Sequence, residues 1–158
     1  MFDDPYYSDE ICDCDNEASF ALFVDHDEIR PRYASIIEKF VKDYGLQLMG
    51  QGRHRRSYLS ASGKYVYKFP INVHGENANK EETTIYAADS EGNKARCRLI
   101  WVQSLPVVIM EVVTPWWLDK RGQGQNGDRL PDWIWAYDGG QVGFNRKGKL
   151  VAWDYTLS

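Results

Sequence analysis

The clearest pattern of hydrophobic and polar positions along the chain predicts a helix over residues 31–44. Pro31 suits the first helical turn, where its missing N–H costs little, and Gly45 suits the position just after the end. Apolar side chains recur between them at spacings of three and four, which places them on one helical face: Tyr33, Ile36, Ile37, Phe40, Val41 and Tyr44. We therefore expect an amphipathic helix that packs on a core.

Shorter patterns after this helix predict three strands. Residues 46–49 form the first and run into Gly50-Gln51-Gly52, residues 57–61 form the second, and residues 64–70 form the third after a turn. Alternation in the third segment divides its side chains between two faces of a sheet. One face holds Tyr65, Tyr67 and Phe69, and the other holds Val66 and Lys68.

The rest of the chain predicts a second helix at about 75–88, followed by strands at 97–103 and 106–113. The second of these strands has an unbroken apolar run that is typical of a central strand. Later patterns indicate a loop at 114–129, a short helix at 130–137, and a hairpin from 141–144 and 149–153. The order predicts an α+β fold, with a mostly antiparallel five-stranded sheet, one or two packed helices and a C-terminal β-hairpin.

Length and composition restrict the class of protein. The 158 residues, 43% hydrophobic and 27% charged, fit one globular domain and exclude a wholly disordered or collagen-like chain. No apolar run reaches the length of a membrane span, and the start lacks the features of a secretory signal. Cys12, Cys14 and Cys97 form no disulfide framework or zinc site. We expect a cytoplasmic protein with no membrane partner.

Charge divides the chain into an acidic leader, residues 1–29, and a domain with a basic excess, residues 30–158. The leader holds ten acidic side chains and no Lys or Arg, and the remainder has a net charge of +6. Three interpretations are open: a solvated tail, a segment that folds back on the basic stretch 53–56, or a polyanion mimic that occupies a partner's basic groove. Apolar residues interrupt the acidity, so we expect part of the leader to dock: Phe20, Leu22, Phe23 and Val24. Mimicry makes the acidic residues candidates for partner binding, among them Asp3, Asp4, Asp9 and Glu10.

A glycine-containing turn followed by an inward lysine is one way to hold phosphates. Glycine lets the backbone approach the anion, and the lysine supplies a charge from a later strand. Gly50, Gly52 and Lys68 have this order. An inward lysine needs a partner, and Glu82 lies on the helical face that we expect to meet the sheet, with Glu81 as its rival. The alternatives are an ordinary hairpin turn, an edge lysine that reaches solvent, and two solvated glutamates.

Together these segments resemble the N-terminal lobe of the protein-kinase-like fold, and the small kinases encoded by T7-like phages come nearest. Residues 48–68 look like the glycine-rich loop, the second strand and the strand that carries the phosphate-binding lysine, here Lys68. By this resemblance Glu82 pairs with that lysine, and Met110 and Glu111 lie at the hinge that meets adenine. The closing hairpin is similar to the two strands after the kinase catalytic loop.

The resemblance also implies ATP and Mg²⁺ as cofactors. Asp154 follows the hairpin where the metal-binding Asp of a kinase stands, and Gln141 takes the position of the metal-binding Asn. The likeness spans about residues 46–156 and rests on the order and spacing of the segments.

The chain departs from the kinase pattern where catalysis takes place. Arg55 replaces the third glycine of the loop, and only 27 residues separate Val113 from Gln141, where a kinase builds several helices. No His-Arg-Asp occurs; Ala136 stands where the catalytic Asp belongs, and Asp138 is the nearest candidate. Losing the group that orients the acceptor costs orders of magnitude in rate. We therefore expect a shrunken, non-catalytic domain in which nucleotide binding is still open.

Other clusters have both a functional and a structural interpretation. Arg53, Arg55 and Arg56 are candidate contacts to a partner or to phosphates, and the alternative is a solvated loop. Trp116 and Trp117 are either an exposed anchor for a partner or core residues. The histidines lack the spacing of a metal site and are expected at the surface: His26, His54 and His74.

The expected function is that of a non-catalytic, kinase-like phage accessory protein that binds and modulates or inhibits a protein in the host cytoplasm. A second hypothesis is a minimal ATP-dependent protein kinase or nucleotidyltransferase that uses Lys68, Glu82, Asp138 and Asp154. A third is nucleic-acid binding through residues 53–56, or inhibition by polyanion mimicry. The net charge of −4 makes nucleic acid the less favoured partner.

Overall fold

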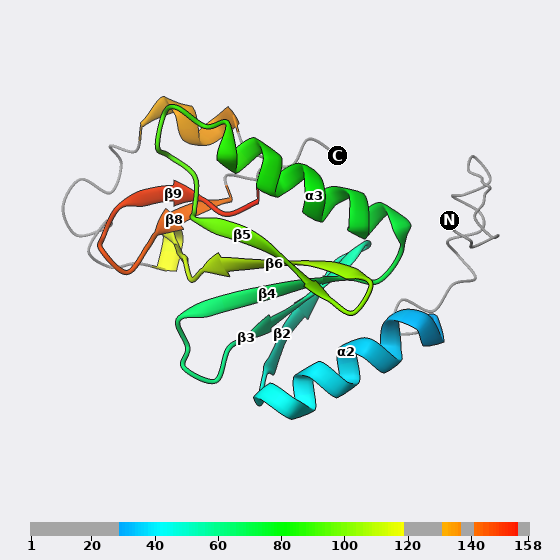
Figure 1. Cartoon of the computed structure of the whole chain (residues 1–158). Helices are drawn as coiled ribbons and strands as arrows, with labels where there is room; N and C mark the ends of the chain where they lie inside the picture. Colours follow the sequence, from blue (N-terminus) through cyan, green and yellow to red (C-terminus); the bar gives the residue numbers. More distant parts are fainter. Residues whose placement is uncertain (1–28, 119–130, 137–140, 155–158) are drawn as a thin grey trace.

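The chain folds into two helices and two antiparallel sheets (Figure 1), in a computed structural model that describes residues 29–118, 131–136 and 141–154. The larger sheet has five strands in the order β2-β3-β4-β6-β5, and the smaller has three in the order β7-β8-β9. The helices are α2 (Pro31–Tyr44) and α3 (Val73–Ala87). The strands are β2 (Gln47–Gln51), β3 (Arg55–Leu59), β4 (Tyr65–Pro70), β5 (Cys97–Val102), β6 (Leu105–Glu111), β7 (Thr114–Pro115), β8 (Val142–Phe144) and β9 (Leu150–Ala152). The predicted α+β class, five-stranded sheet and closing hairpin are confirmed.

Helix α2 covers one face of the five-stranded sheet, below the sheet in Figure 1. Its bounds match the prediction: Pro31 opens the first turn, and Gly45 ends the helix with φ 66° while its N–H donates to the Val41 carbonyl. Tyr33 and Ile37 are buried against sheet residues such as Phe69. The apolar face of α2 therefore forms the first of two cores.

Helix α3 covers the opposite face of the sheet (Figure 1). It begins at Val73, two residues earlier than predicted, because the Asn72 side chain caps it by accepting the Gly75 N–H at 2.9 Å. The start of the helix lies so close to the loop before β3 that a Cβ on Gly75 would overlap the His54 carbonyl oxygen. Glycine is therefore required at this crossing.

Strand β6 lies between β4 and β5 and serves both cores, as expected for a central strand. Leu105 and Val107 point to the α2 side, and Val108 and Met110 point to the α3 side. All four are at most 1% exposed. This strand therefore joins the two hydrophobic clusters into one packed unit.

Three sequence predictions differ from the structure. Residues 53–56 do not form one solvated loop, because Arg55 and Arg56 belong to β3, which runs over 55–59 rather than 57–61. The predicted loop after β6 contains a short strand, β7, which pairs with β8. The predicted helix at 130–137 is a 3₁₀ helix over Asp132–Ala136, and a second 3₁₀ helix spans Trp116–Leu118.

No helix among the described residues is long and apolar enough to cross a membrane.

Candidate functional site

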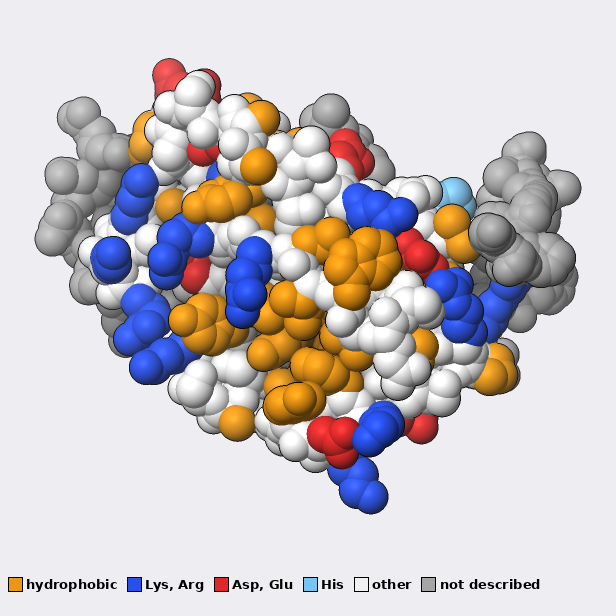
Figure 2. Space-filling view, in the orientation of Figure 1, with side chains coloured by type: hydrophobic (Ala, Val, Ile, Leu, Met, Phe, Trp, Pro, Cys, Tyr) orange, Lys and Arg blue, Asp and Glu red, His pale blue; other side chains and the backbone are white. Residues whose placement is uncertain are grey.

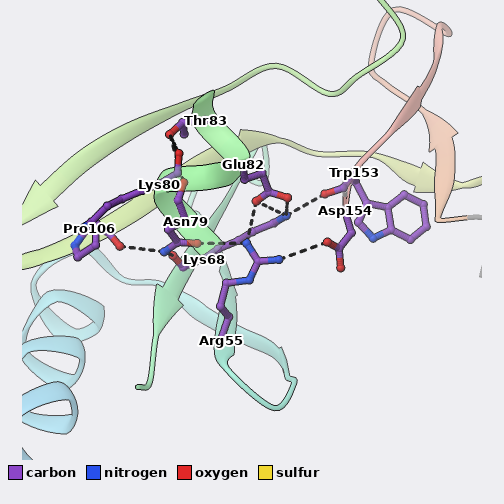
Figure 3. A network of polar contacts seen from close by, with 9 residues as sticks. All are labelled: Arg55, Lys68, Asn79, Lys80, Glu82, Thr83, Pro106, Trp153 and Asp154. Carbon is purple, nitrogen blue, oxygen red and sulfur yellow. Dashed lines mark hydrogen bonds and ion pairs between the residues drawn. The ribbon is translucent and has the colours of Figure 1, made fainter. Parts of the chain in front are cut away.

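Lys68 lies at the centre of a polar network between the sheet and α3 (Figure 3). It alternates with Tyr67 and Phe69 on β4, so its side chain projects to the α3 side and is only 6% exposed. Its Nζ donates to both carboxylate oxygens of Glu82, at 3.1 and 3.2 Å, and to the Trp153 carbonyl at 2.8 Å. The inward lysine predicted from strand alternation is thus buried and fully bonded.

Glu82 is the partner of Lys68, as the helical face predicted, and its side chain has no exposure. Its Oε1 also accepts a hydrogen bond from Arg55 Nη1 at 2.8 Å. Burial by itself raises the pKa of Glu82, but the charges of Lys68 and Arg55 outweigh burial and bring the pKa below its ordinary value. Glu82 is therefore an ionised carboxylate held between two cations.

Arg55 binds three side chains at once. Besides Glu82, its guanidinium donates to Asn79 Oδ1 at 3.1 Å and to Asp154 Oδ1 at 3.3 Å. It reaches this position because Ser57, two residues later on β3, is paired with Lys68 on β4, so Arg55 and Lys68 share a sheet face. Figure 3 shows the guanidinium between the helix and the segment after β9.

Asn79 fixes the helix to the sheet beneath this network. Its Nδ2 donates to the carbonyl oxygens of Lys68, at 2.9 Å, and Pro106, at 2.8 Å, while its Oδ1 accepts from Arg55. The side chain is fully buried and uses both ends of its amide. Asn79 therefore positions Arg55 and Glu82 relative to the strands.

The network balances its own charges. The two cations, Lys68 and Arg55, face the two carboxylates, Glu82 and Asp154. Burial lowers the pKa of Lys68 below its ordinary value, and the charge of Glu82 offsets part of that shift. The formal charges of these four side chains therefore cancel.

Of the residues predicted to hold Mg²⁺, Gln141 and Asp154 lie among the described residues, and a protein usually offers this ion one or two carboxylates. Within the described residues, no group of three or more His, Cys, Asp or Glu side chains is placed to hold a metal. Asp154 is partly exposed, but one of its oxygens accepts from Arg55. The Gln141 carbonyl accepts the Trp153 N–H at 3.1 Å, so the hairpin brings Gln141 beside Asp154. Asp138 lies outside the described residues.

The residues predicted to contact adenine and phosphate lie in strands β2 and β6 and in the turn after β2. Gly50 lies within β2, and the Gly52 N–H donates to the Arg55 carbonyl at 2.8 Å. Met110 is 1% exposed in the core. The Glu111 N–H donates to the Arg96 carbonyl at 3.0 Å, and the Glu111 carboxylate accepts the Arg96 N–H at 2.8 Å.

Among the described residues, the candidate partner-binding side chains differ in their exposure. Arg53 is exposed, whereas Arg56 is half-buried and donates to Gln51 Oε1 at 2.7 Å. Trp116 packs against the core, and Trp117 is 43% exposed, so each tryptophan fits one of the two interpretations. The acidic candidates lie outside the described residues: Asp3, Asp4, Asp9 and Glu10.

His54 is not the plain surface residue that the sequence predicted. It is half-buried, and its ring centroid lies 5.1 Å from that of His74. Burial, and then the charge of His74, lower its pKa to about 4. His54 is therefore neutral at physiological pH, and His26 lies outside the described residues.

Sequence reasoning missed the structural roles of Arg55 and Asn79. Asn79 precedes Glu82 by three residues on α3, so helical spacing placed it on the same face. The only signal for Arg55 was its spacing of two residues from Ser57, which puts both side chains on one face of a strand. No local pattern indicated that its carboxylate partners are residues 82 and 154. The three residues that the kinase resemblance puts in one site, Lys68, Glu82 and Asp154, do lie together.

No protein-family model matches the sequence, and no curated protein matches it either. The function is therefore inferred from the geometry of this network and from the charges of the chain.

Proposed function

We propose that this chain is a non-catalytic, kinase-like phage accessory protein that binds and modulates or inhibits a host protein. The observation that carries the non-catalytic part is the guanidinium of Arg55, which bridges Glu82 and Asp154. In a kinase, the Asp at this position holds Mg²⁺, which neutralises the developing phosphate charge. Here a side chain of the protein itself is the cation bound to that carboxylate.

The kinase-like part is supported by the Lys68–Glu82 pair. Protein kinases need an ion pair between a strand lysine and a helix glutamate for activity. Lys68 comes from β4 and Glu82 from α3, the helix that directly follows it, and their atoms lie 3.1 Å apart. The Lys68–Glu82 ion pair is present, but Arg55 adds a third charge to it. This arrangement favours a structural role for the ion pair.

The binding part is supported by the charge pattern. Residues 1–29 carry ten acidic side chains and no Lys or Arg, which suits a basic groove on a partner. Trp117 adds an aromatic side chain that is 43% exposed, and aromatic residues often dominate binding energy. A host protein with a basic groove is the partner that these features fit best.

Thermal unfolding with and without Mg²⁺ and ATP tests the non-catalytic part. Binding at 100 times Kd stabilises a protein by about 2.7 kcal/mol, which is a readily measured shift in Tm. We expect no such shift and no transfer of labelled phosphate or nucleotide. A magnesium-dependent shift that Asp154→Asn abolishes, and that the matched surface change Asp43→Asn leaves intact, would establish the minimal ATP-dependent enzyme instead.

Partner capture at low and high salt tests the binding part. The full chain is compared with a variant in which four leader acids are neutralised: Asp3→Asn, Asp4→Asn, Asp9→Asn and Glu10→Gln. We expect the variant to capture less partner, and capture by the full chain to weaken as salt rises from about 0.05 to 0.5 M, since salt screens exposed charges. Equal, salt-independent capture would remove the leader from the mechanism.

A further inference from the structure

A basic surface lies where the β8–β9 hairpin meets the five-stranded sheet. It consists of six exposed cationic residues from three segments that are distant in the sequence: Lys64, Arg96, Arg98, Arg146, Lys147 and Lys149. Figure 2 shows Lys and Arg side chains gathered over this end of the molecule, at the left of the view. Apart from Arg96, none of the six forms an ion pair with another described residue.

The contacts of Glu111 and its neighbours hold the three segments together. The Glu111 carboxylate accepts the Arg96 N–H and lies 3.5 Å from both Arg96 Nε and Asn145 Nδ2. Asn145 Oδ1 accepts the N–H groups of Lys147 and Lys149, each at 2.9 Å, which fixes the hairpin turn. The Lys64 carbonyl accepts the N–H of the residue after Glu111 at 3.2 Å. Glu111 and Asn145 therefore join the segments that carry the six cations, and of the six only Arg96 pairs with the Glu111 carboxylate.

An apolar strip borders the basic surface on the α2 side of the sheet. Tyr65 and Tyr67 alternate on β4 with their side chains on this face, and Ile109 is paired with Tyr67 on β6. Tyr65 is 42% exposed, and at the far end of the strip Tyr44 is 61% exposed. Phe40 connects the two ends, with its ring 5.6 Å from Tyr67 and 4.5 Å from Tyr44. Figure 2 shows hydrophobic side chains in the middle of this face, beside the cations.

A ligand for this face must combine negative charge with apolar side chains, and the chain carries such a segment. Residues 1–28 contain ten acidic side chains, no Lys or Arg, and an apolar group at Phe20, Leu22, Phe23 and Val24. We propose that the basic surface and the apolar strip bind residues 1–28 of the same chain.

Length and tethering favour this occupant. The segment joins the described structure at Ile29, and 28 residues span about 30 Å as a flexible coil and about 90 Å when extended. A tethered segment also has an effective concentration in the millimolar range, which a free ligand rarely reaches. The net charge of −4 disfavours nucleic acid as the occupant. A host protein that captures the leader would have to compete with this surface and would uncover it.

Paramagnetic broadening in the full chain tests the proposal. A nitroxide is attached at Cys12 in a chain that carries Cys14→Ser and Cys97→Ser, and backbone amide signals are recorded by NMR. We expect residues 96–98 and 145–149 to lose most of their intensity and residues around Lys80, on α3 at the opposite face of the sheet, to keep theirs. The effect should be independent of protein concentration and disappear at about 0.5 M NaCl, because it is electrostatic.

Matched charge reversals provide the control. Lys147→Glu with Lys149→Glu should abolish the broadening, whereas Lys80→Glu, on α3 at the opposite face of the sheet, should leave it unchanged. Absence of broadening in the labelled chain, or broadening that the hairpin changes leave intact, would overturn the proposal. Broadening seen only when labelled and unlabelled chains are mixed would assign the surface to a second copy. If the labelled chain shows no broadening but binds oligothymidylate, and the hairpin changes abolish that binding, the basic surface would be assigned to nucleic acid.

Discussion

Replacing Glu82 by Gln removes a fully buried negative charge and keeps the shape of the side chain. The carboxylate accepts from Lys68 with both oxygens and from Arg55 at 2.8 Å. An amide in its place keeps one acceptor and turns an N–H₂ group toward two cations. The variant therefore leaves a buried ammonium without its counter-charge.

The contacts that survive set the size of the effect. Breaking a buried ion pair by changing one partner typically costs about 3–5 kcal/mol. Arg55 keeps Asn79 and Asp154, but Lys68 keeps only the Trp153 carbonyl among the partners seen. We therefore expect a loss near the lower end, about 3 kcal/mol in the free energy of unfolding. With a slope of about 2 kcal/mol/M, the urea midpoint falls by about 1.5 M.

Urea unfolding followed by tryptophan fluorescence measures the loss, with Glu81→Gln on the same helix as control. The Glu81→Gln substitution should change the free energy of unfolding by about 0.5 kcal/mol or less. The double variant Lys68→Met with Glu82→Gln should be more stable than Glu82→Gln alone, because it removes the uncompensated charge. A double variant that is less stable than the single one would refute the charge argument.

The pH dependence of the Glu82→Gln variant gives an independent check. Burial lowers the pKa of Lys68, and loss of Glu82 removes the charge that offsets this shift. Between the folded pKa and the ordinary value of 10.5, the unfolded chain binds more protons than the folded chain. The variant should therefore gain stability as the pH rises from about 7 toward 10, more steeply than the unaltered protein.

Two further predictions concern the crossing of α3 and the loop before β3. Gly75→Ala should destabilise the protein by about 3 kcal/mol in urea unfolding, because its Cβ overlaps the His54 carbonyl; Gly50→Ala, with no atom within 4 Å of its Cβ, should change stability little. The pKa of His54 is lowered to about 4, so stability should fall as the pH decreases from 6.5 toward 4, where the unfolded chain binds more protons. Because the ring is partly exposed, the loss of stability due to His54 should be about 1–2 kcal/mol. It should be absent in His54→Gln, and parallel pH profiles for the two proteins would contradict the prediction.

The fold could be predicted where local patterns and their end signals agree. Helix α2 had an apolar period of three and four together with Pro31 and Gly45, and its bounds match residue for residue. The face of Lys68 followed from strand alternation alone, and the face of Glu82 from helical spacing. These features depend on residues within one element, so a single sequence contains them.

The position of Arg55 could not be predicted in the same way. A run of four basic residues, from 53 to 56, is typical of a solvated loop. The Arg55 side chain is only 14% exposed because its charge is balanced by partners that are distant in the sequence. Those partners, Glu82 and Asp154, come from a helix and from the segment after β9. The two-residue strand β7 was missed for a similar reason, since Thr114 and Pro115 pair with β8 about 30 residues later.

The place of β6 between β4 and β5 has a consequence for synthesis on the ribosome. Strands β2, β3 and β4 emerge in order and pair as neighbours, but the second edge of β4 has no partner until residues 71–111 have been added. At roughly 5–20 residues per second, this takes about 2 to 8 s. In that interval the open edge can pair with a strand of a neighbouring nascent chain, so slower translation prolongs the risk of aggregation.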